Sequence, residues 1–473
     1  MVFSSLLFLF RFLPAVLLLY YIAPRKIRNL VLFLFSLLFY AWGEPKYVFL
    51  MLFSITMDFF MGQMVAKSKA RNNRKAAKRF LTISIVVNLS ILAFFKYADF
   101  IIGTINSVAG LSLPMLSVPL PIGISFFTFQ TMSYVIDVYK GATKVQKNWV
   151  NYGTYVSMFP QLIAGPIVQY KTIAEQMEHR KENASDFAEG IHRFLLGMGK
   201  KVLLANTIGL LCDAVMALEI TQVPVLTAWL GAIAYTFQIY FDFSGYSDMA
   251  IGLGKMFGFH FLENFNYPYI SRSITEFWRR WHISLSSWFK EYVYIPLGGN
   301  RRGVLLQARN ILVVWMLTGI WHGASWNYVL WGVYYGILLM LEKFLLKPVL
   351  KHLPGVLQNV YTMVLVIFGW VLFKCEDLSY CFSYLKAMVG GFHAGWIGRE
   401  SMYLLRNYGV LLVILLFGCT MIPKKMGQRI TGKFGETSWI GLFLRIVWYG
   451  GIFLISLAYL VDATYNPFLY FRF

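Results

Sequence analysis

The sequence predicts an all-helical protein that crosses a membrane many times. The chain has 473 residues, of which 58% are hydrophobic and only 14% are charged, too few for the surface of a soluble protein of this size. Its mean hydropathy is +0.58. Apolar stretches near the ~20 residues of a spanning helix recur from end to end, separated by short basic clusters. We expect one integral membrane domain over residues 1–473, because no polar stretch is long enough for a separate soluble domain.

The apolar stretches define the candidate spans. The first is predicted to be a retained span, because it lacks the basic start and small-residue cleavage site of a removed leader. Some of the others are short, so re-entrant or tilted segments are also expected. The candidates fall near 4–22, 29–42, 47–65, 80–96, 119–137, 195–216, 223–241, 244–260, 310–322, 326–342, 357–373, 403–422 and 439–461.

Lysine and arginine residues predict the orientation. Basic clusters at 25–28 and 67–79 are two spans apart, so they share one side of the membrane, and the positive-inside rule makes that side cytoplasmic. The N-terminus is then extracytoplasmic, in a multi-pass protein of the cytoplasmic membrane. The net charge of +21 does not indicate nucleic acid, because the basic residues form short clusters between apolar runs.

The four cysteines predict neither a metal site nor a disulfide framework. Cys212, Cys375, Cys381 and Cys419 are scattered, with no CxxC pair and no ligand spacing. We interpret them as small core residues, and we expect no bound metal and no bound cofactor.

Two segments interrupt the apolar pattern. Residues 158–170 place Pro160, Gly165 and Pro166 in an apolar run, which predicts a re-entrant loop that lines a cavity. Residues 171–194 form the longest polar stretch and predict a cytoplasmic connector, with a helix that starts near 183–185.

The segment 275–292 is too charged to span a membrane and predicts one amphipathic helix. Arg279, His282, Ser286 and Lys290 share its polar face. A membrane-surface helix accounts for the arginines and tryptophans, but it gives no reason for an imidazole at His282. The apolar face carries Phe277, Trp281, Leu285, Trp288 and Tyr292.

His322 is the most informative residue of the sequence. If Arg309 marks the cytoplasmic boundary, His322 lies ~20 Å into a hydrocarbon core of ~30 Å. Ionisable groups at such depth usually serve function, and the alternative is a structural histidine bonded to backbone carbonyls. A buried neutral imidazole can act as a general base. Because no GxSxG motif and no Cys–His arrangement is present, we expect direct attack by a substrate hydroxyl rather than by a protein nucleophile.

Polar residues elsewhere leave two interpretations open. Asp248, in the glycine-rich stretch 241–258, forms either an internal salt bridge or part of the site. Arg301 and Arg302 follow a Gly-Gly turn, which either holds a phosphate of a donor or is an ordinary basic turn.

Several segments together resemble the membrane-bound O-acyltransferase (MBOAT) family. The likeness is closest to its bacterial branch with the alginate O-acetylation protein AlgI and the teichoic-acid D-alanylation protein DltB, and AlgI is the nearer of the two. The first and last residues, "MVFSSLLFLF" and "NPFLYFRF", are also similar to AlgI. The core motifs, within 158–334, are "FPQLIAGPI", "FDFSGYSDMAIG", "EFWRRWHISLSSW", "YIPLGGNRRG" and "TGIWHGASWNYVLWG".

The resemblance implies a fold and a set of site residues. The fold would be a ring of tilted helices around a central funnel and tunnel, with re-entrant helices. His322 matches the family's principal catalytic histidine, and His282 matches its second site histidine. The remaining candidates line the substrate passage: Trp281, Ser286, Trp288, Trp321, Trp326, Asp248 and Tyr246.

The resemblance also implies a reaction. A cytoplasmic acyl thioester, acetyl-CoA above all, would donate an acetyl group to an extracytoplasmic partner of the SGNH-esterase kind, which modifies an exported polysaccharide. The alternatives are D-alanyl transfer of the DltB type, a transporter or flippase without acyl chemistry, and a non-catalytic assembly platform.

Overall fold

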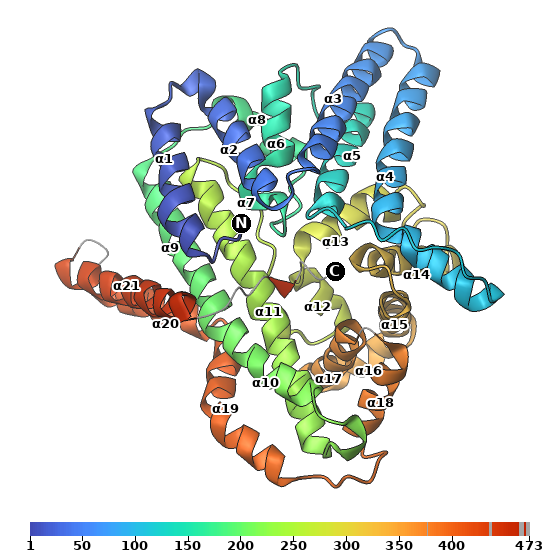
Figure 1. Cartoon of the computed structure of the whole chain (residues 1–473), viewed down its shortest axis with the longest axis vertical. Coiled ribbons are helices and arrows are strands. Elements are labelled where there is room, and N and C mark those ends of the chain that lie inside the picture. The colour runs from blue at the N-terminus through green and yellow to red at the C-terminus, as the bar shows by residue number, and fades with distance from the viewer. Residues whose placement is uncertain (376, 435–437, 463–467, 470–473) are drawn as a thin grey trace. The chain divides into compact units, whose positions relative to one another are not determined.

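The computed structural model describes residues 1–375, 377–434, 438–462 and 468–469, and every regular element among them is helical (Figure 1). In this described part, nine helical segments are long and apolar enough to cross a membrane. The prediction of an all-helical multi-pass protein is therefore confirmed. The nine are Arg25–Gly43, Val48–Ala70, Arg74–Ala109, Ala184–Met216, Val304–His322, Trp326–His352, Gly355–Lys374, Arg399–Gly418 and Trp439–Asp462.

The chain forms two compact units. The first comprises residues 1–194 and 247–262, and the second comprises residues 195–246 and 263–473. Two helices contribute to both units, α9 (Ala184–Gly199) and α11 (Val225–Met256). The single domain and the central funnel expected from the sequence stay predictions.

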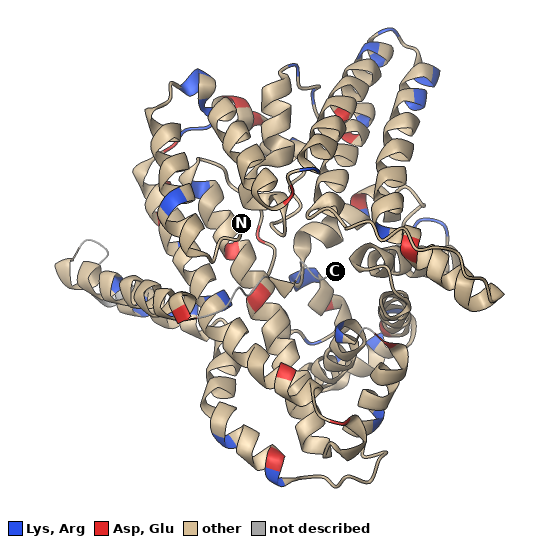
Figure 2. Cartoon of the chain, viewed as in Figure 1, with Lys and Arg blue, Asp and Glu red and all other residues tan. Residues whose placement is uncertain are grey.

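The first unit is built around a pair of long helices, α3 and α4. Buried Asp58 of α3 accepts hydrogen bonds from Ser84 (2.5 Å) and Asn88 (2.7 Å) of α4, which satisfies a carboxylate inside an apolar pair. Lysines and arginines gather at the turn that joins the two helices (Figure 2). The orientation that the positive-inside rule assigns from them stays a prediction. The helices of this unit include α1 (Leu13–Ile22), α2 (Arg28–Gly43), α3 (Val48–Ala70), α4 (Arg74–Ala109), α5 (Ile124–Lys140), α6 (Trp149–Ser157), α7 (Phe159–Leu162) and α8 (Tyr170–His179).

The predicted break at 158–170 is present. The four-residue helix α7 is followed by non-helical chain, and this whole stretch is buried within the first unit. Protein groups satisfy the freed backbone, because the Tyr155 hydroxyl donates to the Val168 carbonyl at 3.0 Å. The predicted helix start near 183–185 is also confirmed, since α9 begins at Ala184.

The second unit contains a tight helical hairpin that fixes the position of His322. Helix α14 ends at His322, and α15 begins four residues later at Trp326. A Cβ atom on Gly319 would lie 2.2 Å from the Tyr328 carbonyl oxygen, so only glycine allows the two backbones to approach this closely. The helices of this unit include α10 (Asn206–Met216), α12 (Ile274–Arg280), α13 (Ile283–Phe289), α14 (Val304–His322), α15 (Trp326–Leu341), α16 (Lys347–His352), α17 (Gly355–Lys374), α18 (Leu378–Met388), α19 (Arg399–Gly418), α20 (Ile422–Phe434) and α21 (Trp439–Asp462).

Two predicted boundaries are wrong. The candidate spans 223–241 and 244–260 are parts of one helix, α11, because its mid-helix Asp242 is buried and paired with Lys201 instead of ending the helix. The single amphipathic helix over 275–292 is two short helices, α12 and α13, with a break at Trp281 and His282.

The break has a tertiary cause. The backbone carbonyl of Asn264 accepts from the Ile283 N–H at 3.0 Å, and its side-chain oxygen accepts from the Ser284 N–H at 3.2 Å. These bonds replace the intrahelical bonds that a continuous helix would make to the same two groups.

Candidate active site

His322 lies inside a cage of aromatic rings in the second unit. Its side chain is 7% exposed at the end of α14. Trp321, Trp331 and Phe373 surround it, with ring centroids 5.1 to 5.2 Å from the imidazole and ring planes 70° to 83° from its plane. Such edge-to-face contacts hold the imidazole in one orientation in an apolar setting.

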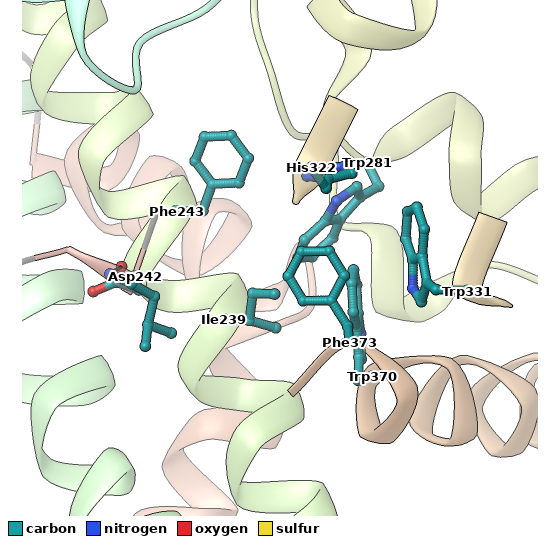
Figure 3. A pocket seen from close by; sticks show the side chains of 9 residues that line it. Ile239, Asp242, Phe243, Trp281, His322, Trp331, Trp370 and Phe373 are labelled. Atoms are coloured by element: carbon teal, nitrogen blue, oxygen red, sulfur yellow. Dashed lines mark hydrogen bonds between the residues drawn. The ribbon is translucent and has the colours of Figure 1, made fainter. Parts of the chain in front are cut away.

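A small cavity adjoins His322 (Figure 3). Its volume of about 20 Å³ is enough for a water molecule. Three lining residues, Ile239, Asp242 and Phe243, come from α11. The others come from the break between α12 and α13, from α14, α15 and α17, and from the segment 468–469: Trp281, His322, Trp331, Trp370, Phe373 and Leu469.

His282 is held in an unusual backbone conformation by Asn264. With φ at 44° and ψ at 55°, His282 lies in the left-handed region, which costs free energy for any residue except glycine. Its Nδ1 is 3.1 Å from the Asn264 side-chain oxygen, which also accepts from the Ser284 hydroxyl at 2.9 Å.

These contacts fix the tautomer of His282. A backbone N–H can only donate, so the Asn264 atom that faces the Ser284 N–H is the oxygen, and His282 Nδ1 must donate to it. The lone pair of the neutral imidazole is then on Nε2. Burial lowers the pKa of His282 to about 3, which keeps the ring neutral at physiological pH.

The two histidines share aromatic neighbours. The Trp321 ring is 6.3 Å from the His282 ring and 5.1 Å from the His322 ring, measured between centroids. Phe243, a lining residue of the cavity, contacts His282 edge-on at 4.7 Å. The structure thus brings together, in one unit, the two imidazoles that the sequence singles out forty residues apart.

The predicted passage residues of α12 to α15 do not all reach this cavity. Trp281 lines it, and the Trp321 ring contacts both histidine rings. Trp288 is buried against Tyr292, with ring centroids 5.1 Å apart, and does not line the cavity. The Ser286 hydroxyl donates to the Trp278 carbonyl at 3.4 Å, and Trp326 is 52% exposed.

Asp248 and Tyr246 have other neighbours. Asp248 belongs to the first unit and forms an ion pair with Arg193 at 2.6 Å, so the salt-bridge interpretation is the one that the structure supports. Tyr246 belongs to the second unit and packs edge-on against Phe468, with ring centroids 4.4 Å apart.

Arg301 and Arg302 are exposed on the turn before α14. Asn310 stabilises this turn by donating to the Gly299 carbonyl at 3.0 Å, and Gly298 and Gly299 both have positive φ. Neither arginine lines the cavity beside His322.

Sequence reasoning missed several residues of the site. Asn264 lies in a loop without any periodic pattern, and Trp370 and Phe373 look like ordinary apolar residues of a spanning helix. Asp242 could have been found, because a carboxylate inside an apolar stretch needs a partner.

Comparison with known proteins adds the family context. The model of the MBOAT, membrane-bound O-acyltransferase, family matches residues 19–385. The probable alginate O-acetylase AlgI of Pseudomonas aeruginosa is 45% identical over 82% of this chain and 75% of its own length. The probable alginate O-acetylase AlgI of Pseudomonas putida is 40% identical over 100% of both chains. A peptidoglycan O-acetyltransferase of Helicobacter pylori is 35% identical over 82% of this chain and 80% of its own length.

Proposed function

This chain belongs to the membrane-bound O-acyltransferase family, and we propose that it moves an acetyl group from a cytoplasmic thioester toward a polysaccharide outside the cytoplasmic membrane. As a member of this family it is an O-acyltransferase and a multi-pass membrane protein, so the transporter alternative is set aside. The acyl group, its donor and the roles of the histidines are the content of the proposal.

The position of His322 at the cavity is the observation that carries the proposal. An imidazole that adjoins a small, aromatic-lined space can take the proton of an acceptor hydroxyl while the aromatic rings keep bulk water away. The acceptor oxygen then bonds to the acyl carbon, the carbon–sulfur bond of the thioester breaks, and the hydroxyl proton ends on the released thiol.

The tautomer of His282 suits a supporting role. With Nδ1 committed to Asn264, neutral His282 offers Nε2 as a hydrogen-bond acceptor and not as a donor. It would orient the acceptor hydroxyl rather than stabilise the negative charge that develops on the acyl oxygen.

Trp331 is the better candidate for stabilising that charge. Trp331 lines the cavity, and its buried indole N–H donates no hydrogen bond to any residue in the described part of the chain. A buried N–H aimed at a developing oxyanion is worth far more than one in water, because no solvent must reorganise.

Acetyl transfer is preferred to D-alanyl transfer because the three relatives reported above carry names of O-acetylases or O-acetyltransferases. The donor would be acetyl-CoA on the cytoplasmic side, and Arg301 and Arg302 stay candidates for its phosphates. The acceptor would be an extracytoplasmic SGNH-type partner or the exported polysaccharide itself. The N-terminus would be extracytoplasmic.

Thioester turnover by the purified full-length protein tests the proposal. With a soluble oligosaccharide supplied as the acceptor, release of free thiol from acetyl-CoA is expected from the wild type and is expected to fall at least a hundredfold in His322→Ala. The exposed His352 supplies the matched control, since His352→Ala should retain wild-type turnover. Undiminished turnover in His322→Ala would remove His322 from the mechanism.

The direction of transfer needs a second measurement. Proteoliposomes that receive acetyl-CoA on one side only should acetylate an acceptor enclosed on the other side. Mass spectrometry of cell-envelope glycans, with and without this protein, would identify the acceptor, and D-alanyl esters in place of acetyl esters would refute the choice of acyl group.

A further inference from the structure

Two residues near the end of the chain are part of the core of the second unit. Phe468 is 1% exposed and Leu469 is 8% exposed. Leu469 is also a wall of the cavity that His322 lines, far from it in sequence.

A buried ion pair anchors this segment. The backbone N–H of Leu469 donates to one carboxylate oxygen of Asp242 at 2.9 Å, and the other oxygen contacts the Lys201 ammonium. Asp242 and Lys201 are each 2% exposed. An ion pair at such burial is stable only when hydrogen bonds satisfy its remaining polar sites, so the Leu469 N–H is part of what makes the pair tolerable.

Aromatic contacts strengthen the anchor. The Lys201 ammonium lies over the Phe468 ring, 4.7 Å from its centroid. The Tyr246 ring packs edge-on against the same Phe468 ring, with centroids 4.4 Å apart. Cation–π attraction is largest where the cation is desolvated, as it is here. One carboxylate therefore fixes α11, the π-helical turn Lys200–Ala205 and the segment 468–469 together.

The walls of the cavity differ in how readily they can be enlarged. Most of the lining is aromatic and is packed ring against ring, such as Trp281 against Trp370 at 4.7 Å. Leu469 and Ile239 are the two aliphatic lining residues. Of these two, Leu469 lies on the separate segment 468–469. This segment is held by the hydrogen bond from the Leu469 backbone N–H to Asp242, which a change of the Leu469 side chain leaves in place.

We infer that Leu469, anchored through its backbone to Asp242, sets the upper size limit of the acyl group that this cavity accepts. The inference rests on the proposed function. The cavity has room for one group of about the size of a water molecule or a methyl, so the methyl of an acetyl group would fill it. One more methylene would then collide with the cavity walls, of which the Leu469 side chain is one. The bond changes of the transfer step are the same for every acyl chain, and only the fit of the chain differs. One additional methylene in an apolar pocket changes selectivity by roughly 10- to 200-fold.

The test compares acetyl-CoA with propionyl-CoA and butyryl-CoA as donors for the full-length protein in detergent, with the same soluble oligosaccharide as acceptor throughout. Leu469→Ala should raise the ratio of propionyl to acetyl turnover at least tenfold, because the larger cavity accepts the additional methylene. Leu469→Met, which conserves volume, should keep the wild-type ratio. Leu415→Ala is the matched control, because Leu415 is fully buried in the same core but does not line the cavity, and its ratio should also equal that of the wild type.

The outcomes separate this inference from the proposed function. Absence of turnover with every thioester in the wild type would overturn the proposed function. If the wild-type protein turns over acetyl-CoA but Leu469→Ala has the same propionyl-to-acetyl ratio as the wild type, the role of Leu469 is overturned and the proposed function is not. If size-exclusion chromatography shows that Leu469→Ala is misfolded, the milder Leu469→Val decides. A ratio raised at least twofold supports the inference, and an unchanged ratio refutes it.

Discussion

The side-chain oxygen of Asn264 lies 3.1 Å from Nδ1 of His282 and bonds to Ser284 through both its backbone N–H and its hydroxyl. One amide therefore holds the left-handed turn at His282, ends the preceding helix and selects the tautomer of the imidazole. Asn264 and His282, eighteen positions apart in sequence, together fix the orientation of the imidazole and leave its Nε2 as the hydrogen-bond acceptor.

The contact between Asn264 and His282 can be tested with the variant Asn264→Asp. A carboxylate in place of the amide would favour the charged imidazolium and raise the pKa of His282 from about 3 toward neutrality. The rate of thioester turnover should then gain an acidic limb, falling as the pH decreases through the new pKa. Turnover against pH, measured for both proteins, checks this, and superimposable profiles would contradict the role assigned to Asn264.

The low pKa of His282 also predicts a stability effect. The pKa is about 3 in the folded protein and near 6.5 in an unfolded chain, so the unfolded state binds more protons between these values. Folding stability should be full above pH 6.5 and should decrease as the pH falls toward 3. Thermal unfolding in detergent should show a smaller decrease for His282→Gln, because glutamine does not titrate. Equal decreases for both proteins would argue against a buried neutral imidazole.

Trp331→Phe keeps the aromatic ring but removes the N–H that we assign to the acyl oxygen. We expect kcat to fall about a hundredfold with little change in KM, since the lost bond acts mainly in the transition state. The matched control is Trp278→Phe, because the Trp278 N–H is likewise buried without an acceptor among the described residues but does not line the cavity. An equal decrease of kcat in the two variants would mean that Trp331 acts through packing and not through its N–H.

The crossing of α14 and α15 predicts a stability difference between two glycines. Gly319→Ala would place a Cβ 2.2 Å from a backbone oxygen of Tyr328, and relieving this overlap should cost about 3 kcal/mol or more and shift His322. In Gly336→Ala of the same hairpin, the tightest contact of the new Cβ is the end of the flexible Leu312 side chain, at 3.2 Å, and the next, Trp315 Cβ at 3.4 Å, is an ordinary contact, so this change should be nearly neutral. Unfolding midpoints of the two variants give the comparison, and similar midpoints would contradict the close crossing.

The sequence by itself determined the class of the protein and the residues worth examining. Apolar runs and the spacing of basic clusters depend only on the order of residues along the chain, so the many membrane-spanning helices follow without any contact being known. An imidazole in an apolar run is costly wherever it folds, which singles out His322. His282 is singled out for another reason, because an amphipathic surface helix gives no role to an imidazole.

Only the tertiary structure decided what these residues contact. Helical periodicity across 275–292 gave no sign of a break, because the hydrogen bonds that cause it come from Asn264, outside the segment. No local pattern predicts that Leu469 lies at the cavity of His322. That position depends on the buried carboxylate of Asp242 in α11, which lies 227 residues earlier in the chain. Local sequence fixes how each residue partitions between lipid, protein and water, whereas partners distant in the chain are fixed by the packing of whole helices.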